Sequence, residues 1–254
     1  MKKLTPAPVP SVPSPPQGGN SSGPAKPVPR CYSMGFAALV TSLLLTACSS
    51  KPPAPEWQMN AKSSAERAAE AWLVGDARIE AVEFARARRE ITSTGRADLL
   101  ARAELLRCAT RVASLVFEPC AGFDALAQDA APAERAYSRY LQGAATPADA
   151  ALLPEAHRAL VTSTAPDAAV ASIEDPLSRL VAAGVLLKSG RATPGVIGTA
   201  VDTASARGWR RPLLAWLGVQ RDRALAASAT EEAARLQRRM DLVAPAPTQP
   251  ASPR

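Results

Sequence analysis

The sequence predicts an all-α protein, and three observations support this expectation. Beyond residue 60 the chain is rich in Ala, Leu, Arg and Glu, which have high helix propensity. Apolar residues recur there every three or four positions, as on one face of a helix. Proline and glycine mark starts and stops, and no segment alternates apolar and polar residues like a strand. We expect about nine helices joined by short connections.

The first part of this region contains three expected helices. Gly75 and Asp76 separate the first from the second, and Pro119 stops the third. In the second helix, Ile79 and Val82 carry the apolar period and are expected to face the core. The expected ranges are 61–74, 77–91 and 99–116.

The remaining helices are marked mainly by their starts. Asp175 and Thr193 each stand before a proline, the pattern of an N-cap followed by proline in the first turn. Gly190 and Gly208 are the matching stops. The expected ranges are 133–141, 147–153, 155–161, 176–187, 194–204, 212–225 and 230–242.

The segment 64–91, with its Gly75-Asp76 turn and the small residues Ala81 and Ala85, resembles a tetratricopeptide helical hairpin. Segments 180–204 and 214–240 are similar to it more loosely. The resemblance implies antiparallel helix pairs stacked in an array. However, no strict period of about 34 residues is present. An irregular helical bundle is the alternative, because Ala and Leu stripes mark any buried helix face.

A leader is expected at the N-terminus. The run from Met34 to Leu45 carries no charge, and Lys26 and Arg30 precede it. Its length fits the hydrophobic region of a signal peptide. It falls short of the roughly 20 apolar residues that a membrane-spanning helix requires.

The leader ends in Leu45-Thr46-Ala47-Cys48, which resembles the lipobox of bacterial lipoproteins. The resemblance implies cleavage after Ala47 and attachment of lipid to Cys48, the membrane anchor. Ser49 follows the cysteine, where an aspartate would imply retention in the inner membrane. The resemblance therefore implies an outer-membrane lipoprotein facing the periplasm, with the inner membrane less favoured.

These features divide the chain into four parts. Residues 1–47 are a low-complexity region and signal peptide, and residues 48–60 are the lipidated cysteine and a flexible, proline-containing tether. Residues 61–243 form the helical domain, and residues 244–254 form a disordered, proline-rich tail.

The net charge of +7 does not indicate nucleic-acid binding. Lys2, Lys3, Lys26 and Arg30 lie in the leader, which has no acidic residue, so the remainder carries only +3. Basic and acidic residues alternate along that remainder, as on an ordinary solvated surface.

Cys108 and Cys120 remain if Cys31 is removed with the leader and Cys48 carries lipid. Two thiols in an oxidising compartment tend to pair, and the break at Pro119 allows the chain to turn back. One hypothesis is therefore a disulfide between these two cysteines. The alternative is that Cys108 is a small, buried apolar residue on a helix face.

No catalytic motif, metal site or cofactor site is indicated. His157 is the only histidine, and we expect it on an exposed helix face between Glu155 and Arg158. No Gly-x-Ser-x-Gly elbow accompanies it, so the protein is not expected to be an enzyme. A cleft that joined His157 to a serine and a carboxylate would favour a hydrolase instead.

The expected function is that of a tethered helical scaffold that binds other, unidentified envelope proteins. Trp209, at a junction between helices, is the candidate partner contact, since aromatic residues dominate binding hot spots. Within the same class, a pilotin-like or assembly-complex lipoprotein is an alternative that rests on analogy. The alternative of another class is an envelope hydrolase with an unrecognised active site.

Overall fold

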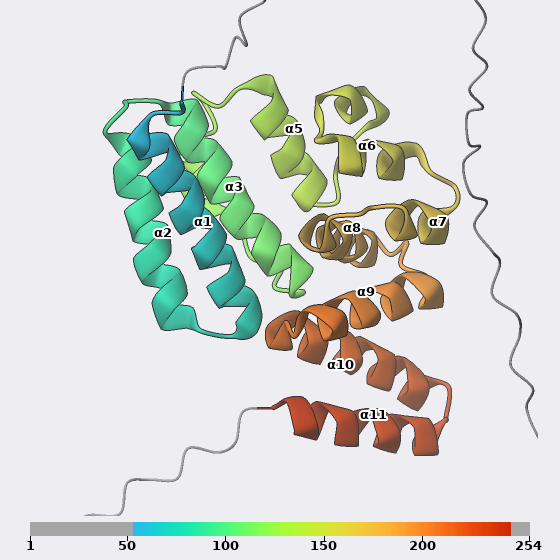
Figure 1. The fold of residues 1–254 in the computed structure, drawn as a ribbon. Coiled ribbons are helices and arrows are strands. Elements are labelled where there is room, and N and C mark those ends of the chain that lie inside the picture. Colours follow the sequence, from blue (N-terminus) through green and yellow to red (C-terminus); the bar gives the residue numbers. More distant parts are fainter. Residues whose placement is uncertain (1–52, 245–254) are drawn as a thin grey trace, which may run out of the picture. The chain divides into compact units, whose positions relative to one another are not determined.

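A computed structural model describes residues 53–244, and Figure 1 shows their all-α fold. The leader, Cys48 and the tail from residue 245 lie outside the described residues. Eleven α-helices and one 3₁₀ helix follow one another in this part of the chain, and it contains no strand. Their bounds are α1 Glu56–Val74, α2 Ala77–Thr92, α3 Ala97–Ala113, α4 Ala121–Asp124, α5 Pro132–Leu141, η1 Pro147–Leu152, α6 Glu155–Thr162, α7 Pro166–Ala171, α8 Pro176–Lys188, α9 Pro194–Arg207, α10 Arg210–Ala226 and α11 Thr230–Val243.

The hairpin of α1 and α2 turns where the sequence predicts. Gly75 ends α1 with a φ of +98°, a left-handed conformation that glycine adopts without steric penalty. The side chain of Asp76 then caps α2 by accepting a hydrogen bond of 2.9 Å from the backbone N–H of Ile79. The two helices pack along each other, side by side in Figure 1.

The later helices pack mostly in chain order. The third helix, α3, contacts α1 and α2 on one side and α5 and α8 on the other. From α8 onward, each helix packs on the next, through α9 and α10 to α11. The short segments from α4 to α7 interrupt this order, so the described chain contains helical pairs without a uniform repeat (Figure 1).

The close packing of α8 on α3 depends on Gly184. A Cβ atom at this position would lie 2.4 Å from the backbone carbonyl oxygen of Val112. Because backbone atoms cannot swing aside, the two helices approach closely only where the side chain is a hydrogen.

A polar joint connects the end of α1 to the start of α10. Arg210 donates to the carbonyl oxygen of Val74 at 2.8 Å, and Arg211 donates to that of Trp72 at 2.9 Å. Both carbonyls lie in the last turn of α1, where the usual partner four residues on is missing, although that of Trp72 also accepts from the N–H of Gly75 at 3.1 Å. Cations favour this negative end of the helix dipole. The Trp72 ring lies between the guanidinium groups of Arg211 and Arg111, at 3.7 and 3.9 Å. The joint therefore fixes the first hairpin to the C-terminal helices.

Helix α2 corrects one expectation about the core. Ile79 and Val82 are 51% and 58% exposed, so the prediction that they face the core was wrong. The buried face carries Glu80 and Phe84 instead, followed by Ala87 and Ile91. Glu80 is accommodated because Arg107 and Arg111 of α3 bind its carboxylate at 2.8 and 3.1 Å.

Several helices begin or end at other residues than the sequence predicts. Because α1 begins at Glu56, residues 56–60 are helical and do not belong to an extended tether. The sequence does not predict the short helices α4 and α7, because each is too brief for a readable apolar period. In contrast, Asp175 and Thr193 cap α8 and α9 as predicted, by accepting from the N–H groups of Ser178 and Val196.

Candidate functional site

A cleft with a volume of about 880 Å³ lies among α1, α3, α5, η1, α6 and the first turn of α8. Volumes of this size are typical of small-ligand sites. The α1 side presents Ala61 and Ala65, one turn apart, whose small side chains leave space between the helices. The α3 side adds leucines, and Trp57 lines the cleft from the first turn of α1. Charged side chains also belong to these two walls, Lys62 and Glu66 on α1 and Arg102 on α3.

The opposite wall carries an aromatic and polar cluster from α5 and α6. Tyr137 and Tyr140 stand three residues apart on α5, with ring centroids 5.9 Å apart. The His157 ring lies 4.8 Å from Tyr140 and 5.7 Å from Tyr137. Both tyrosines lie in the expected helix 133–141, and nothing in the sequence period indicated that they would meet a histidine.

His157 is buried, which corrects the expectation that it lies on an exposed helix face. Its side chain turns inward from α6, where the residue is 2% exposed. Its Nδ1 atom is hydrogen-bonded to the hydroxyl of Tyr140 at 3.1 Å. Burial lowers the pKa of His157 to about 4, an effect that the Asp175 carboxylate opposes. The ring is thus neutral at pH 7.

Tyr137 presents a neutral phenol to the cleft. Burial raises the pKa of Tyr137, and the nearby Asp175 carboxylate raises it further. Among the hydrogen bonds of residues 53–244, none is formed by the Tyr137 hydroxyl or by Nε2 of His157. Both groups belong to residues that line the cleft.

Glu134, one turn before Tyr137 on α5, is held by Arg102. The guanidinium of Arg102 donates twice to Oε1 of Glu134, at 2.7 and 3.0 Å. The other oxygen, Oε2, is buried without a partner in the described part of the chain. The Glu134 carboxylate is therefore paired in charge, and its hydrogen-bonding capacity is only partly used.

Ser178 brings a hydroxyl to the same cleft from the first turn of α8. The cleft therefore contains a histidine, a serine and a carboxylate, the combination that would favour a hydrolase. Their contacts do not form a relay, since His157 Nδ1 is bonded to Tyr140 rather than to a carboxylate. No hydrogen bond joins Ser178 Oγ to His157 among the described residues. A serine nucleophile needs an adjacent base, and the base needs an orienting partner.

Comparison with known protein families, curated proteins and solved structures finds no match. What this chain does must therefore be inferred from its own residues.

Trp209 does not form the expected partner contact. It is 4% exposed, and its indole Nε1 donates to the Glu70 carboxylate of α1 at 2.9 Å. The expectation was wrong because the helix junction folds back onto α1 rather than projecting into solvent. The sequence placed Trp209 at a junction but contained no signal for its partner, which lies 139 residues earlier.

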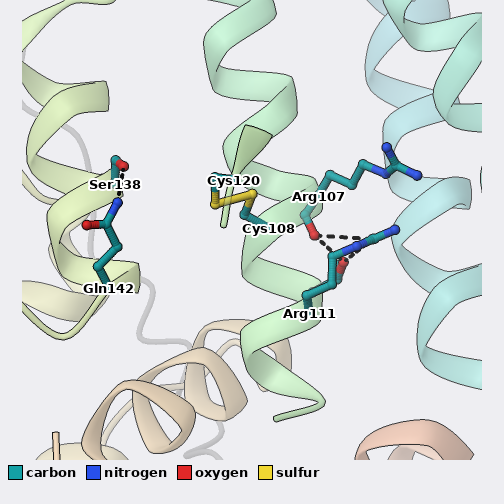
Figure 2. The surroundings of a disulfide bond; sticks show 7 residues. Arg107, Cys108, Arg111, Cys120, Ser138 and Gln142 are labelled. Atoms are coloured by element: carbon teal, nitrogen blue, oxygen red, sulfur yellow. Dashed lines mark hydrogen bonds between the residues drawn. A yellow bond between two sulfur atoms is a disulfide. The ribbon is translucent and has the colours of Figure 1, made fainter. Parts of the chain in front are cut away.

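The two cysteines expected as a possible pair form a disulfide in the structure (Figure 2). Cys108 lies on α3 between Arg107 and Arg111, and Cys120 immediately precedes α4. Their Cα atoms are 5.9 Å apart, a normal separation for such a bond.

Two kinds of feature are absent from residues 53–244. No group of three or more His, Cys, Asp or Glu residues in that range is placed to hold a metal ion. No helix within the same range has the length and apolar character needed to span a membrane. Leu45, Thr46, Ala47 and Cys48, the expected cleavage and lipidation residues, lie before the described part.

Proposed function

We propose that this chain is a lipid-anchored protein of the bacterial envelope that binds partners and catalyses no reaction. The Leu45-Thr46-Ala47-Cys48 sequence supports the anchor, and Ser49 supports an outer-membrane position facing the periplasm. In this proposal, lipid on Cys48 confines the helical domain to a membrane surface. Confinement raises its effective concentration toward partners on the same surface.

The cleft is the observation that carries the binding role. It is open to solvent, and its lining is mostly apolar, with polar and charged side chains on several of its helices. Such a combination is typical of binding sites, where apolar contacts supply affinity and polar groups fix orientation. The contacts of His157 favour binding over catalysis, because its ring is oriented by a tyrosine and has a pKa near 4.

Anchoring is tested by metabolic labelling with a palmitate analogue. Wild-type protein should incorporate the label and remain with the membrane fraction, whereas Cys48→Ala should do neither. Equal labelling of Cys48→Ala would overturn the anchor.

Binding is tested by recovering partners from envelope extracts with the full-length protein. Ala133 lines the cleft, so Ala133→Trp should reduce the recovered set. Leu225→Trp, at a residue of α10 that is 54% exposed and outside the cleft, should not. If both variants recover the wild-type set, partners do not use the cleft and the proposed binding role fails.

A hydrolase is the second candidate, because His157, Ser178 and Glu134 share the cleft. A fluorophosphonate probe reacts with activated serine nucleophiles. Labelling of wild-type protein that is lost in Ser178→Ala but kept in Ser205→Ala would favour the hydrolase. Our proposal predicts no specific labelling of any of the three proteins.

A further inference from the structure

Helix α2 presents an outer face that no helix of residues 53–244 covers. It lies at the edge of the array in Figure 1 and packs on α1 and α3 through the face that carries Glu80 and Phe84. The exposed side carries Ile79 and Val82, which are 51% and 58% exposed. These two large apolar side chains stand one turn apart, so a surface that covered both would gain the stabilisation of their burial.

Three arginines lie on the same side of α2. Arg78, Val82 and Arg89 are spaced by four and seven residues, which a helix of about 3.6 residues per turn places in one row. Arg86 adjoins this row, and its side chain is 51% exposed. Arg78 and Arg89 are exposed, and neither side chain forms an ion pair or hydrogen bond within the described part of the chain. The outer row is therefore apolar in its middle and cationic at both ends.

The carboxylates of α2 lie away from this row. Glu80 is buried, where α3 binds it. The Glu83 side chain is 15% exposed and is bound by Arg67 of α1 at 2.8 Å, a closer contact than its 3.7 Å to Arg86. Glu90 is half-buried on the flank of the row. The exposed row itself thus contains three cations and no carboxylate.

We propose that this face binds an anionic phospholipid surface. The outer face of α2 is defined by Arg78, Ile79, Val82, Arg86 and Arg89. Its two apolar side chains enter the boundary between headgroups and acyl chains, and its guanidinium groups pair with lipid phosphates. Apolar residues flanked by basic residues are typical of helices that lie in the plane of a membrane interface.

The small size of the outer face favours a lipid surface over a protein partner. A stable protein interface buries about 800 Å² on each partner around an apolar core, which requires more than two large apolar side chains in one row. A lipid surface can be bound through a smaller area, because a lipid anchor and a basic patch act as two combined signals.

The position of α2 in the chain also suits a membrane contact. Cys48 precedes the first residue of α1 by eight positions, a reach of at most roughly 30 Å. Ile91 near the end of α2 belongs to the same apolar cluster as Ala61 near the start of α1, so Arg89 lies at the tether end of this hairpin. The inference rests on the proposed anchor and deepens it, because the contact would orient the anchored domain on its membrane.

The test is photo-crosslinking of the full-length protein in living cells. A photoreactive amino acid at position 82 should give a phospholipid adduct, identified by mass spectrometry. The same amino acid at position 225 of α10, where Leu225 is 54% exposed, should not. In vesicles, the adduct from position 82 should form with phosphatidylglycerol, decrease in high salt and be at least fivefold weaker with phosphatidylcholine.

A pair of double variants tests the arginines. Arg78→Gln combined with Arg89→Gln should lower the adduct yield from position 82 at least fivefold, because each basic residue near an anionic surface contributes a factor of roughly five. Arg223→Gln combined with Arg238→Gln makes the same change in net charge at exposed residues of α10 and α11 and should leave the yield unchanged. Thermal unfolding should show that both double variants remain folded, since all four side chains are exposed.

Four results would overturn the proposal: no adduct from position 82, a protein adduct in place of a phospholipid adduct, equal phospholipid adducts from positions 82 and 225, or equal yields in the two double variants. The palmitate label on Cys48 tests the anchor separately. If Cys48 is labelled and position 82 gives no phospholipid adduct, the contact fails and the anchor stands. If Cys48 is not labelled and the adduct still depends on Arg78 and Arg89, the contact stands and the anchor fails.

Discussion

The indole of Trp209 donates a hydrogen bond to the carboxylate of Glu70 at 2.9 Å and thereby connects two residues 139 positions apart. Arg210 and Arg211 follow Trp209 directly and bind the last carbonyls of α1. The three residues form one joint between the first hairpin and α10. Since α1 also lines the cleft, this joint helps to hold one of its walls.

The Trp209 side chain is expected to stabilise the fold through both packing and its hydrogen bond. Trp209→Ala should lower the free energy of unfolding by about 3 to 5 kcal/mol, the usual loss for a buried tryptophan. Trp209→Phe keeps most of the ring but loses the N–H, and should cost about 1.5 to 3 kcal/mol. Urea unfolding measures both values. A loss below about 0.5 kcal/mol in Trp209→Ala would contradict the joint.

Two glycines inside helices provide a matched pair. Gly184→Ala should destabilise the protein by about 1 to 3 kcal/mol, because its methyl group would collide with the carbonyl of Val112. At Gly198 on α9, no atom lies within 4 Å of the place that an added methyl group would occupy. Gly198→Ala should therefore stabilise by up to about 1 kcal/mol through helix propensity. Thermal unfolding of the two variants should shift in opposite directions, and a stabilising Gly184→Ala would contradict the close approach of α8 and α3.

The Cys108–Cys120 disulfide closes a short loop, with a sequence separation of 12. Replacing both cysteines with alanine should lower the free energy of unfolding by about 3 kcal/mol, chiefly by freeing the unfolded chain. Reductant should lower the Tm of the wild type and leave that of the double variant unchanged. An equal response of the two proteins to reductant would show that the bond does not contribute.

His157 should make stability depend on pH. Its pKa is about 4 in the folded protein against 6.5 for the unperturbed residue, so the unfolded chain binds the proton more readily. The neutral His157 ring therefore contributes fully to the free energy of unfolding above pH 6.5. That contribution, on the order of 3 kcal/mol, is lost as the pH falls toward 4. Urea unfolding at pH 7.0 and 4.5 measures it. His157→Gln should show a smaller decrease over this interval, and an equal decrease would contradict the burial of a neutral histidine.

Local features of the fold were readable from the sequence. Asp175 and Thr193 cap their helices as predicted, because an N-cap depends on residues within one turn. The turn at Gly75 is local in the same sense. These signals require no knowledge of distant partners, so the all-α fold and most helix starts followed from them.

Local sequence signals did not predict which polar side chains are buried. Glu80 faces the core because Arg107 and Arg111 approach it from α3, and His157 turns inward toward Tyr140 of α5. Each pairing depends on tertiary contacts that periodicity does not encode. The cleft was missed for the same reason, since its walls come from helices far apart in the chain.

Photo-crosslinking in living cells tests most directly whether the cleft is the binding site. Leu152 lines the cleft and is 42% exposed, and Leu225 is comparably exposed on α10 away from it. A photoreactive amino acid at position 152 should give a defined adduct, identified by mass spectrometry, and the same residue at position 225 should not. No defined adduct from position 152, or the same adduct from both positions, would contradict a binding role for the cleft.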